Sequence, residues 1–157
     1  MANYECTWRT NYFTVKDKEL FQKLMGFCSA DGSFKVFNDG PDGKVGLGGD
    51  GCPGCYPEYL EDDQHEELMK ILRDTLGFED DDIGDNMFFD ILRKCVADDD
   101  AIIYKEAGHE KHRYVTTIGQ VITSQEIIYI DLDKFLLQVA CDKLGDPEWC
   151  HRTRMEY

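Results

Sequence analysis

Cysteine is the most reactive residue type in this sequence, and two of the seven cysteines stand at a spacing that metal sites and redox enzymes use. The motif Cys52-Pro53-Gly54-Cys55 can supply half of a tetrahedral zinc site. A closed site needs two more ligands, which would come from elsewhere in the chain: Cys6, Cys28 or His65. A redox role requires the motif at the start of a helix after a strand, and the surrounding glycines and prolines disfavour it. We therefore expect a tight turn and no cofactor, with zinc at Cys52 and Cys55 as the alternative.

The remaining motifs do not assemble into a catalytic site. The glycines from Gly46 to Gly51 match a dinucleotide-binding loop, but the Cys-Pro-Gly-Cys segment that follows cannot open the helix such a loop requires. The segment from Glu79 to Asp90 resembles a calcium loop but has isoleucine where a ligand is needed. His109, Glu110 and His112 gather in a polar turn without a nucleophile or a full metal-ligand set. The sequence therefore predicts that this protein is not an enzyme.

The charge of the chain is concentrated in its middle. The formal net charge is −15, and residues 58–100 contain 16 acids and four bases. We expect this stretch to be an acidic helical segment within a single domain of residues 1–157. Direct binding to nucleic acid is disfavoured, because phosphate requires a basic surface. The acidic segment is either a solvated face or a surface that occupies the basic groove of another protein.

Hydropathy and cysteine usage indicate where the protein works. No apolar run approaches the ~18 residues that a membrane span requires. The N-terminus lacks a basic stretch followed by an apolar one, so no secretory signal is predicted. An odd number of cysteines without such a signal favours free thiols in a reducing compartment. We expect a cytoplasmic protein with no membrane partner.

The elements expected around these motifs form an α+β fold. β-branched and aromatic residues predict an N-terminal strand, a hairpin and a three-stranded meander, namely over Tyr4–Val15, Ser33–Phe37, Lys44–Leu47, Ala101–Glu106, Arg113–Thr123 and Glu126–Ile130. Apolar residues at helical spacing after aspartate caps predict four helices, namely over Lys18–Phe27, from Asp62 or Asp63 to Leu76, from Asp85 to Val96, and from Asp131 or Asp133 to Leu144. Two of these helices are acidic. We expect a mixed or antiparallel sheet with the helices on one face.

The last of these helices carries an apolar stripe. Its members, which we expect to face the core, are Phe135, Leu136, Val139 and Ala140. Gly145 is expected to end the helix.

Three stretches together resemble a group of small acidic proteins that phages and conjugative elements of bacteria carry. They are Arg9-Thr10-Asn11-Tyr12-Phe13-x-Val15, Glu106-Ala107-Gly108-His109-Glu110-Lys111-x-Arg113-Tyr114-Val115, and Leu144-Gly145-Asp146-Pro147-Glu148. The group is similar in setting to antirestriction and anti-CRISPR proteins. The loop from Gly48 to Pro57 lies outside the pattern.

This resemblance implies a viral or plasmid counter-defence protein that acts in the cytoplasm of the host cell. The charge distribution suggests how it would inhibit its target: an acidic surface mimics DNA and competes for the basic, nucleic-acid-binding groove of a nuclease or CRISPR effector. The expected partner-binding residues lie in the acidic segment and are Glu61, Asp62, Asp63, Glu66, Asp80, Asp81 and Asp82.

Two other classes of protein stay open. A sponge that sequesters a nucleotide signal would need a basic and aromatic pocket, built from Trp8, Arg9, Tyr12, Lys111, Arg113 and Tyr114. A metal-binding interaction module would use Cys52 and Cys55. An enzyme ranks last because the sequence offers no site for one.

Overall fold

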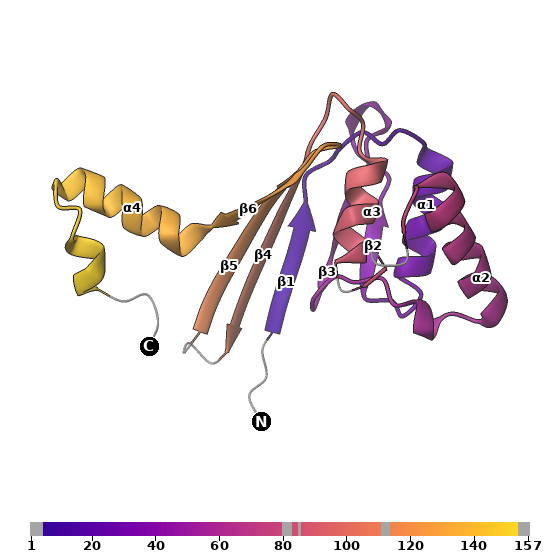
Figure 1. Cartoon of the computed structure of the whole chain (residues 1–157), viewed down its shortest axis with the longest axis horizontal. Helices are drawn as coiled ribbons and strands as arrows, with labels where there is room; N and C mark the ends of the chain where they lie inside the picture. The colour runs from indigo at the N-terminus through magenta and orange to yellow at the C-terminus, as the bar shows by residue number, and fades with distance from the viewer. Residues whose placement is uncertain (1–4, 80–82, 85, 111–113, 154–157) are drawn as a thin grey trace.

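The computed structural model describes residues 5–79, 83–84, 86–110 and 114–153. Within these residues six strands form one open antiparallel sheet in the order β2-β3-β1-β4-β5-β6, accompanied by four α-helices. The α+β class and the antiparallel sheet are therefore confirmed. Figure 1 shows α1, α2 and α3 gathered at one end of the molecule and α4 at the other.

The sheet joins strands from both halves of the chain. Its strands are β1 (Glu5–Thr10), β2 (Phe34–Phe37), β3 (Gly46–Asp50), β4 (Ile102–Glu110), β5 (Tyr114–Ile122) and β6 (Ile127–Asp131). β1 lies between β3 and β4, so that Trp8 pairs with Gly49 on one side and with Glu106 on the other. The predicted hairpin is β2–β3, and the predicted meander is β4–β5–β6.

Two of the four α-helices begin at an aspartate that caps them. The four are α1 (Lys18–Cys28), α2 (Asp62–Lys70), α3 (Met87–Cys95) and α4 (Leu132–Leu144), and α2 continues into a π-helical turn over Ile71–Thr75. Asp17 caps α1 by accepting a hydrogen bond from the Leu20 backbone N–H at 2.9 Å, and Asp131 caps α4 in the same way. Neither Asp62 nor Asp63 caps α2, because the helix already begins at Asp62. The predicted cap Asp85 lies outside the described residues.

The core lies between the sheet and α1, α2 and α3. An aromatic cluster occupies its centre, with the Trp8 ring centroid 5.6 Å from those of Phe34 and Tyr104 and 5.9 Å from that of Phe88. Along β1, buried and exposed residues alternate, so Cys6, Trp8 and Thr10 face the helices. Burial of these rings supplies much of the hydrophobic stabilisation.

Two predicted strands have the wrong limits. The run from Tyr4 to Val15 is not one strand, because β1 ends at Thr10. Directly after β1, the Asn11 side chain bonds to the backbone at the start of β4. Its Oδ1 accepts a hydrogen bond from the Ile103 N–H at 2.7 Å, and its Nδ2 donates one to the Ala101 carbonyl at 3.1 Å. The predicted turn over residues 107–110 is instead the end of β4, because pairing with β1 and β5 overrides the glycine at position 108.

The inward orientation predicted for α4 is wrong. Phe135, Leu136 and Val139 are all exposed, although Asp131 and Gly145 delimit the helix as expected. Figure 1 shows the physical reason: α4 leaves the sheet beyond β6 and projects away from α1, α2 and α3, so none of these helices lies against it.

Candidate functional site

An exposed cluster of carboxylates precedes and opens α2. Six acids lie on a short helical turn (η2, Pro57–Tyr59), at the position that precedes α2, and on the first six residues of α2. We call this cluster the acidic face, and its members are Glu58, Glu61, Asp62, Asp63, Glu66 and Glu67. All six residues are exposed, and no lysine or arginine interrupts the chain between Glu58 and Met69.

Local physical chemistry explains why these acids face outward. α2 docks through Leu68 and Leu72, which are fully buried, so the opposite side of the helix meets solvent. Asp62 and Asp63 occupy the first turn, where carboxylates interact favourably with the helix dipole. Glu67 forms an ion pair with Lys23 of α1, which holds α2 against its neighbour.

The structure describes four of the seven residues that the sequence predicts to bind a partner. Glu61, Asp62, Asp63 and Glu66 belong to the acidic face, as the sequence predicts. Asp80, Asp81 and Asp82 lie outside the described residues.

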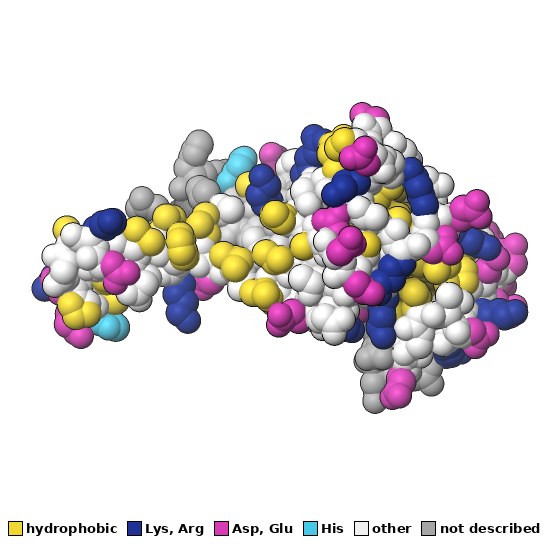
Figure 2. Space-filling model, turned by 90° about the horizontal axis from the view of Figure 1, so that it is seen from above, with side chains coloured by type: hydrophobic (Ala, Val, Ile, Leu, Met, Phe, Trp, Pro, Cys, Tyr) yellow, Lys and Arg dark blue, Asp and Glu magenta, His cyan; other side chains and the backbone are white. Residues whose placement is uncertain are grey.

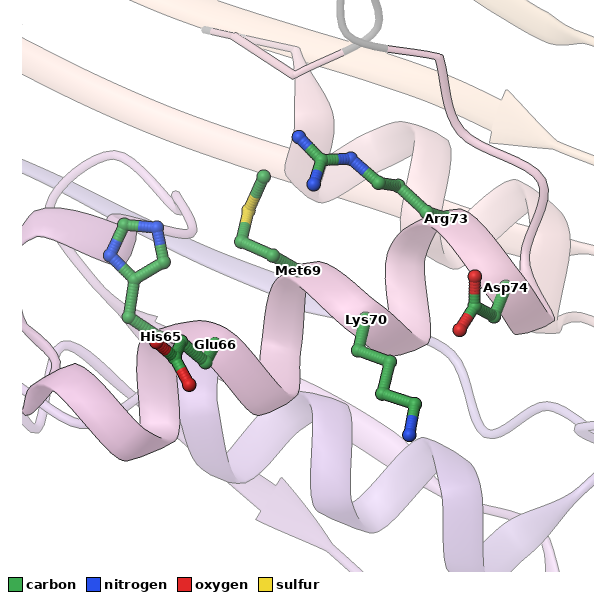
Figure 3. Close-up of a pocket in the computed structure, with 6 residues that line it drawn as sticks. All are labelled: His65, Glu66, Met69, Lys70, Arg73 and Asp74. Atoms are coloured by element: carbon green, nitrogen blue, oxygen red, sulfur yellow. The ribbon is translucent and has the colours of Figure 1, made fainter.

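A hollow of about 460 Å³ along α2 marks where the acidic face ends. Figure 3 shows the two rows of side chains that line it, first His65, Met69 and Arg73, then Glu66, Lys70 and Asp74. Each row follows the i, i+4 spacing of one helix side. Because Lys70 and Arg73 belong to these rows, positive and negative charges are mixed beyond Glu67, and the uninterrupted acidic surface ends there.

The cysteines pair differently from the sequence prediction. Cys55 forms a disulfide with Cys28 at the end of α1, so it is not available to bind zinc together with Cys52. The expectation that all thiols are free is also wrong, because this disulfide exists. Cys52 is an exposed free thiol, and it lies beside Cys6 of β1 and Glu106 of β4.

Cys6, Cys52 and Glu106 form a compact group, which we call the thiol–carboxylate cluster. One donor atom from each lies within 4.8 Å of the others, and Cys6 and Glu106 are buried. The Tyr104 hydroxyl donates a hydrogen bond to Glu106 Oε2 at 2.6 Å, which fixes the carboxylate. Two thiols and a carboxylate are donors that zinc accepts, and a closed zinc site would need a fourth ligand.

The protonation of this cluster does not favour nucleophilic chemistry. Burial, followed by the negative charge of the nearby Glu106 carboxylate, raises the pKa of the Cys6 thiol to about 11. Burial, followed by the hydrogen bond to Glu106, also raises the pKa of Tyr104 well above its usual range. Cys6 is therefore a neutral thiol at physiological pH, and only the thiolate is a strong nucleophile.

The sequence offered Cys6 as a possible zinc ligand together with Cys52, but it did not indicate Glu106, because the three residues come from β1, β4 and the loop after β3. The only local signal was the alternation along β1, which turns Cys6 and Trp8 to the same side.

The residues suggested for a nucleotide site do not share one surface. Trp8 is buried beneath the helices, whereas Arg9 points to the other side of the sheet. The Arg9 guanidinium carbon lies 4.9 Å from the centroid of the Phe37 ring and 6.0 Å from that of Tyr12. Lys111 and Arg113 lie outside the described residues, and Tyr114 is placed only by its backbone in β5.

Comparison of the chain with protein families, with curated proteins and with solved structures finds no match. Among the described residues, no helix is both long enough and apolar enough to cross a membrane.

Proposed function

We propose that this chain is a counter-defence protein of a mobile genetic element, which inhibits a bacterial nuclease or CRISPR effector in the cytoplasm of the host. It binds the basic, nucleic-acid-binding groove of that enzyme through the acidic face. The proposal assigns no catalytic residue, no cofactor, no direct contact with nucleic acid and no membrane partner. The observation that carries it is the group of six exposed carboxylates within residues 58–67, a stretch that contains no lysine or arginine.

The density of these carboxylates matches that of duplex DNA. Asp62, Asp63, Glu66 and Glu67 lie within 140° of one another around the helix and span five residue steps, which is about 7.5 Å of helix axis. Duplex DNA carries one charge per ~1.7 Å of axis, so the same length of duplex carries about four charges. A groove lined with lysine and arginine would meet a comparable field from either molecule.

Electrostatic attraction of this kind acts mainly on the rate of association. Complementary charge steers partners together and weakens as salt screens it, over a Debye length of about 8 Å at physiological ionic strength. The ion pair between Glu67 and Lys23 is exposed, so it offsets the local field only in part.

The test is affinity capture from a bacterial lysate with the tagged chain. We expect recovery of a nucleic-acid-binding enzyme that salt elutes and that duplex DNA displaces. A variant with Glu61→Gln, Asp62→Asn, Asp63→Asn and Glu66→Gln should lose this partner. A matched control neutralises four exposed acids elsewhere: Glu5, Glu126, Asp133 and Glu148. Equal recovery by both variants would contradict the proposal.

A second candidate function is the sequestration of a nucleotide signal. It is supported by a cavity of about 490 Å³ on the side of the sheet away from the helices, whose lining includes Arg9, Lys35 and Phe37. A cation beside an aromatic ring suits a phosphate next to a base. In this case a small molecule would elute on denaturation, and Arg9→Ala would abolish its retention while the four acidic substitutions would not.

A further inference from the structure

The C-terminal part of the chain forms an arm with little cover. We define the C-terminal arm as residues 127–153, which comprise β6, α4 and a short 3-10 helix over Trp149–Arg152. Figure 1 shows α4 extending from the end of β6, past the edge of the sheet and away from α1, α2 and α3. The arm is therefore tied to the body mainly through the pairing of β6 with β5.

The apolar side of α4 faces solvent. Phe135 is 58% exposed, Leu136 46% and Val139 39%. These residues lie on one side of the helix, since they are separated by one, three and four positions. Figure 2 shows hydrophobic side chains in a band that continues from the sheet onto the projecting helix. Contiguous apolar surface of this kind marks an interaction site on a soluble protein.

The adjoining edge of the sheet is equally apolar. Ile128 and Ile130 of β6 are exposed on the sheet side away from the helices, and the exposed Ile103 of β4 lies on the same side, with β5 between the two strands. Tyr129 points to the opposite side and is 61% exposed. β6 pairs with β5 along one edge, and its other edge has no strand partner among the described residues. An open edge of this composition is a template for pairing with another strand.

We propose that a second copy of this chain covers the C-terminal arm in a two-fold symmetric dimer. β6 pairs antiparallel with β6 of the partner subunit, and α4 of each copy packs on the sheet of the other. The register centred on Tyr129 pairs all five residues of the strand, and it sets Ile128 opposite Ile130 of the partner subunit. Because a two-fold axis relates the two copies, this single strand pairing gives hydrogen-bond partners to the open edge of β6 in both.

The chain contains both halves of this interface. An α+β domain is stable when a helix layer covers a sheet. Within the part of the chain that the structure describes, the apolar side of α4 is not covered by a sheet, and the exposed isoleucines of β4 and β6 are not covered by a helix. α4 projects in the direction in which further strands would extend the sheet (Figure 1). It would therefore lie across the strands that the partner adds.

Size and charge also fit a second copy. β6 and α4 together contain 18 residues, and the neighbouring sheet surface adds more, which approaches the 20–30 residues a side of a stable interface. The arm is nearly neutral, with five acids and three bases, whereas residues 58–100 contain 16 acids and four bases. Figure 1 places α2 at the end of the molecule opposite α4, so the dimer keeps the two acidic faces far apart.

Analytical ultracentrifugation of the full chain tests the helix half of the interface. We expect the wild type to sediment at twice the mass of one chain. Phe135→Glu with Val139→Glu should weaken association about a hundredfold, because the new charges are desolvated in the interface. Both positions are exposed in a single copy, so the melting temperature of the monomer should be retained. The control is Tyr59→Glu, at a residue that is 68% exposed on the other end of the molecule, and it should stay dimeric.

A charge exchange tests the strand register. Ile128→Lys alone and Ile130→Glu alone should each weaken the dimer. The double variant should restore it, because each new lysine then lies opposite a new glutamate of the partner subunit. A wild type that is monomeric at every concentration would overturn the proposal. The occupant of the C-terminal arm would then be a different protein. A dimer that none of these variants weakens would overturn it as well.

Discussion

At the scale of single residues, three consecutive aspartates show how the fold assigns different roles to identical side chains. Asp98 and Asp99 are exposed, whereas Asp100 is half-buried. The Lys44 ammonium donates a hydrogen bond to Asp100 Oδ2 at 2.8 Å, and the backbone N–H groups of Thr14 and Ala101 also donate to this carboxylate. The hydrogen bond from Lys44 holds the pKa of Asp100 well below its ordinary value. Asp100 therefore joins β4 to the segment after β1 and to the loop before β3.

Replacing Asp100 with asparagine should lower the free energy of unfolding at pH 7 by about 1.5–3 kcal/mol, the range for hydrogen bonds to a charged group. Since the folded-state pKa is depressed, this stabilisation is present above the unfolded-state pKa of about 3.9 and is lost as the pH falls towards the folded-state value. Urea unfolding at pH 7 and at pH 3 should show a gap between the two proteins that narrows in acid. Asp99→Asn is the control, with an effect within about 0.5 kcal/mol. A gap independent of pH would contradict this assignment.

Residue roles could be predicted from the sequence only where they depend on near neighbours. Asp17 and Asp131 cap the helices that follow them, because a cap needs only the next three residues. The thiol–carboxylate cluster and the bond between Cys28 and Cys55 depend on contacts between distant segments, which no local pattern encodes.

At the scale of elements, the disulfide ties the loop after β3 to the end of α1. The bond between Cys28 and Cys55 closes a loop with a sequence separation of 27 residues, which contains the whole β2–β3 hairpin. Both cysteines are buried within the core. The segment from Gly48 to Pro57, which lies outside the resemblance, is therefore anchored to the body of the protein.

Reduction of this bond should lower the free energy of unfolding by about 3.5 kcal/mol, because the unfolded chain regains the entropy of an open loop. Urea unfolding of the wild type with and without dithiothreitol measures this difference without any substitution in the core. Cys52→Ser should respond to the reductant as the wild type does, and Cys28→Ser should respond to it only weakly. Seven free thiols in the non-reduced native protein would contradict the pairing.

The limits of most elements could be predicted from the sequence, whereas their environment could not. Gly145 ends α4 with a φ of +65°, as a glycine after a helix predicts. The environment of the same helix could not be predicted. The spacing of its apolar residues predicts that one side of α4 is buried, but it does not identify the element or molecule that buries it. β4 is longer than predicted, because four residues that carry turn signals pair with β5, and three of them also pair with β1.

At the scale of the whole molecule, charge and hydrophobicity lie at opposite ends. The acidic face lies with α2 at one end, and the apolar side of α4 lies at the other (Figure 1). A chain with a net charge of −15 repels itself, and this repulsion opposes the compact state. The repulsion between like charges is strongest at the acidic face, where six carboxylates lie within residues 58–67.

Salt should therefore stabilise this protein, and the acidic face should account for much of the effect. Raising ionic strength from 0.01 to 0.15 M shortens the Debye length from about 30 to about 8 Å, so the melting temperature should rise. Neutralising Glu61, Asp62, Asp63 and Glu66 should raise the melting temperature at low salt and reduce its dependence on salt. The control with Glu5, Glu126, Asp133 and Glu148 neutralised changes the net charge equally but relieves less crowding, so its salt dependence should stay closer to that of the wild type. Identical salt dependence in the two variants, measured by scanning calorimetry, would mean that net charge alone matters. The acidic face would then have no local field strong enough to steer a basic partner.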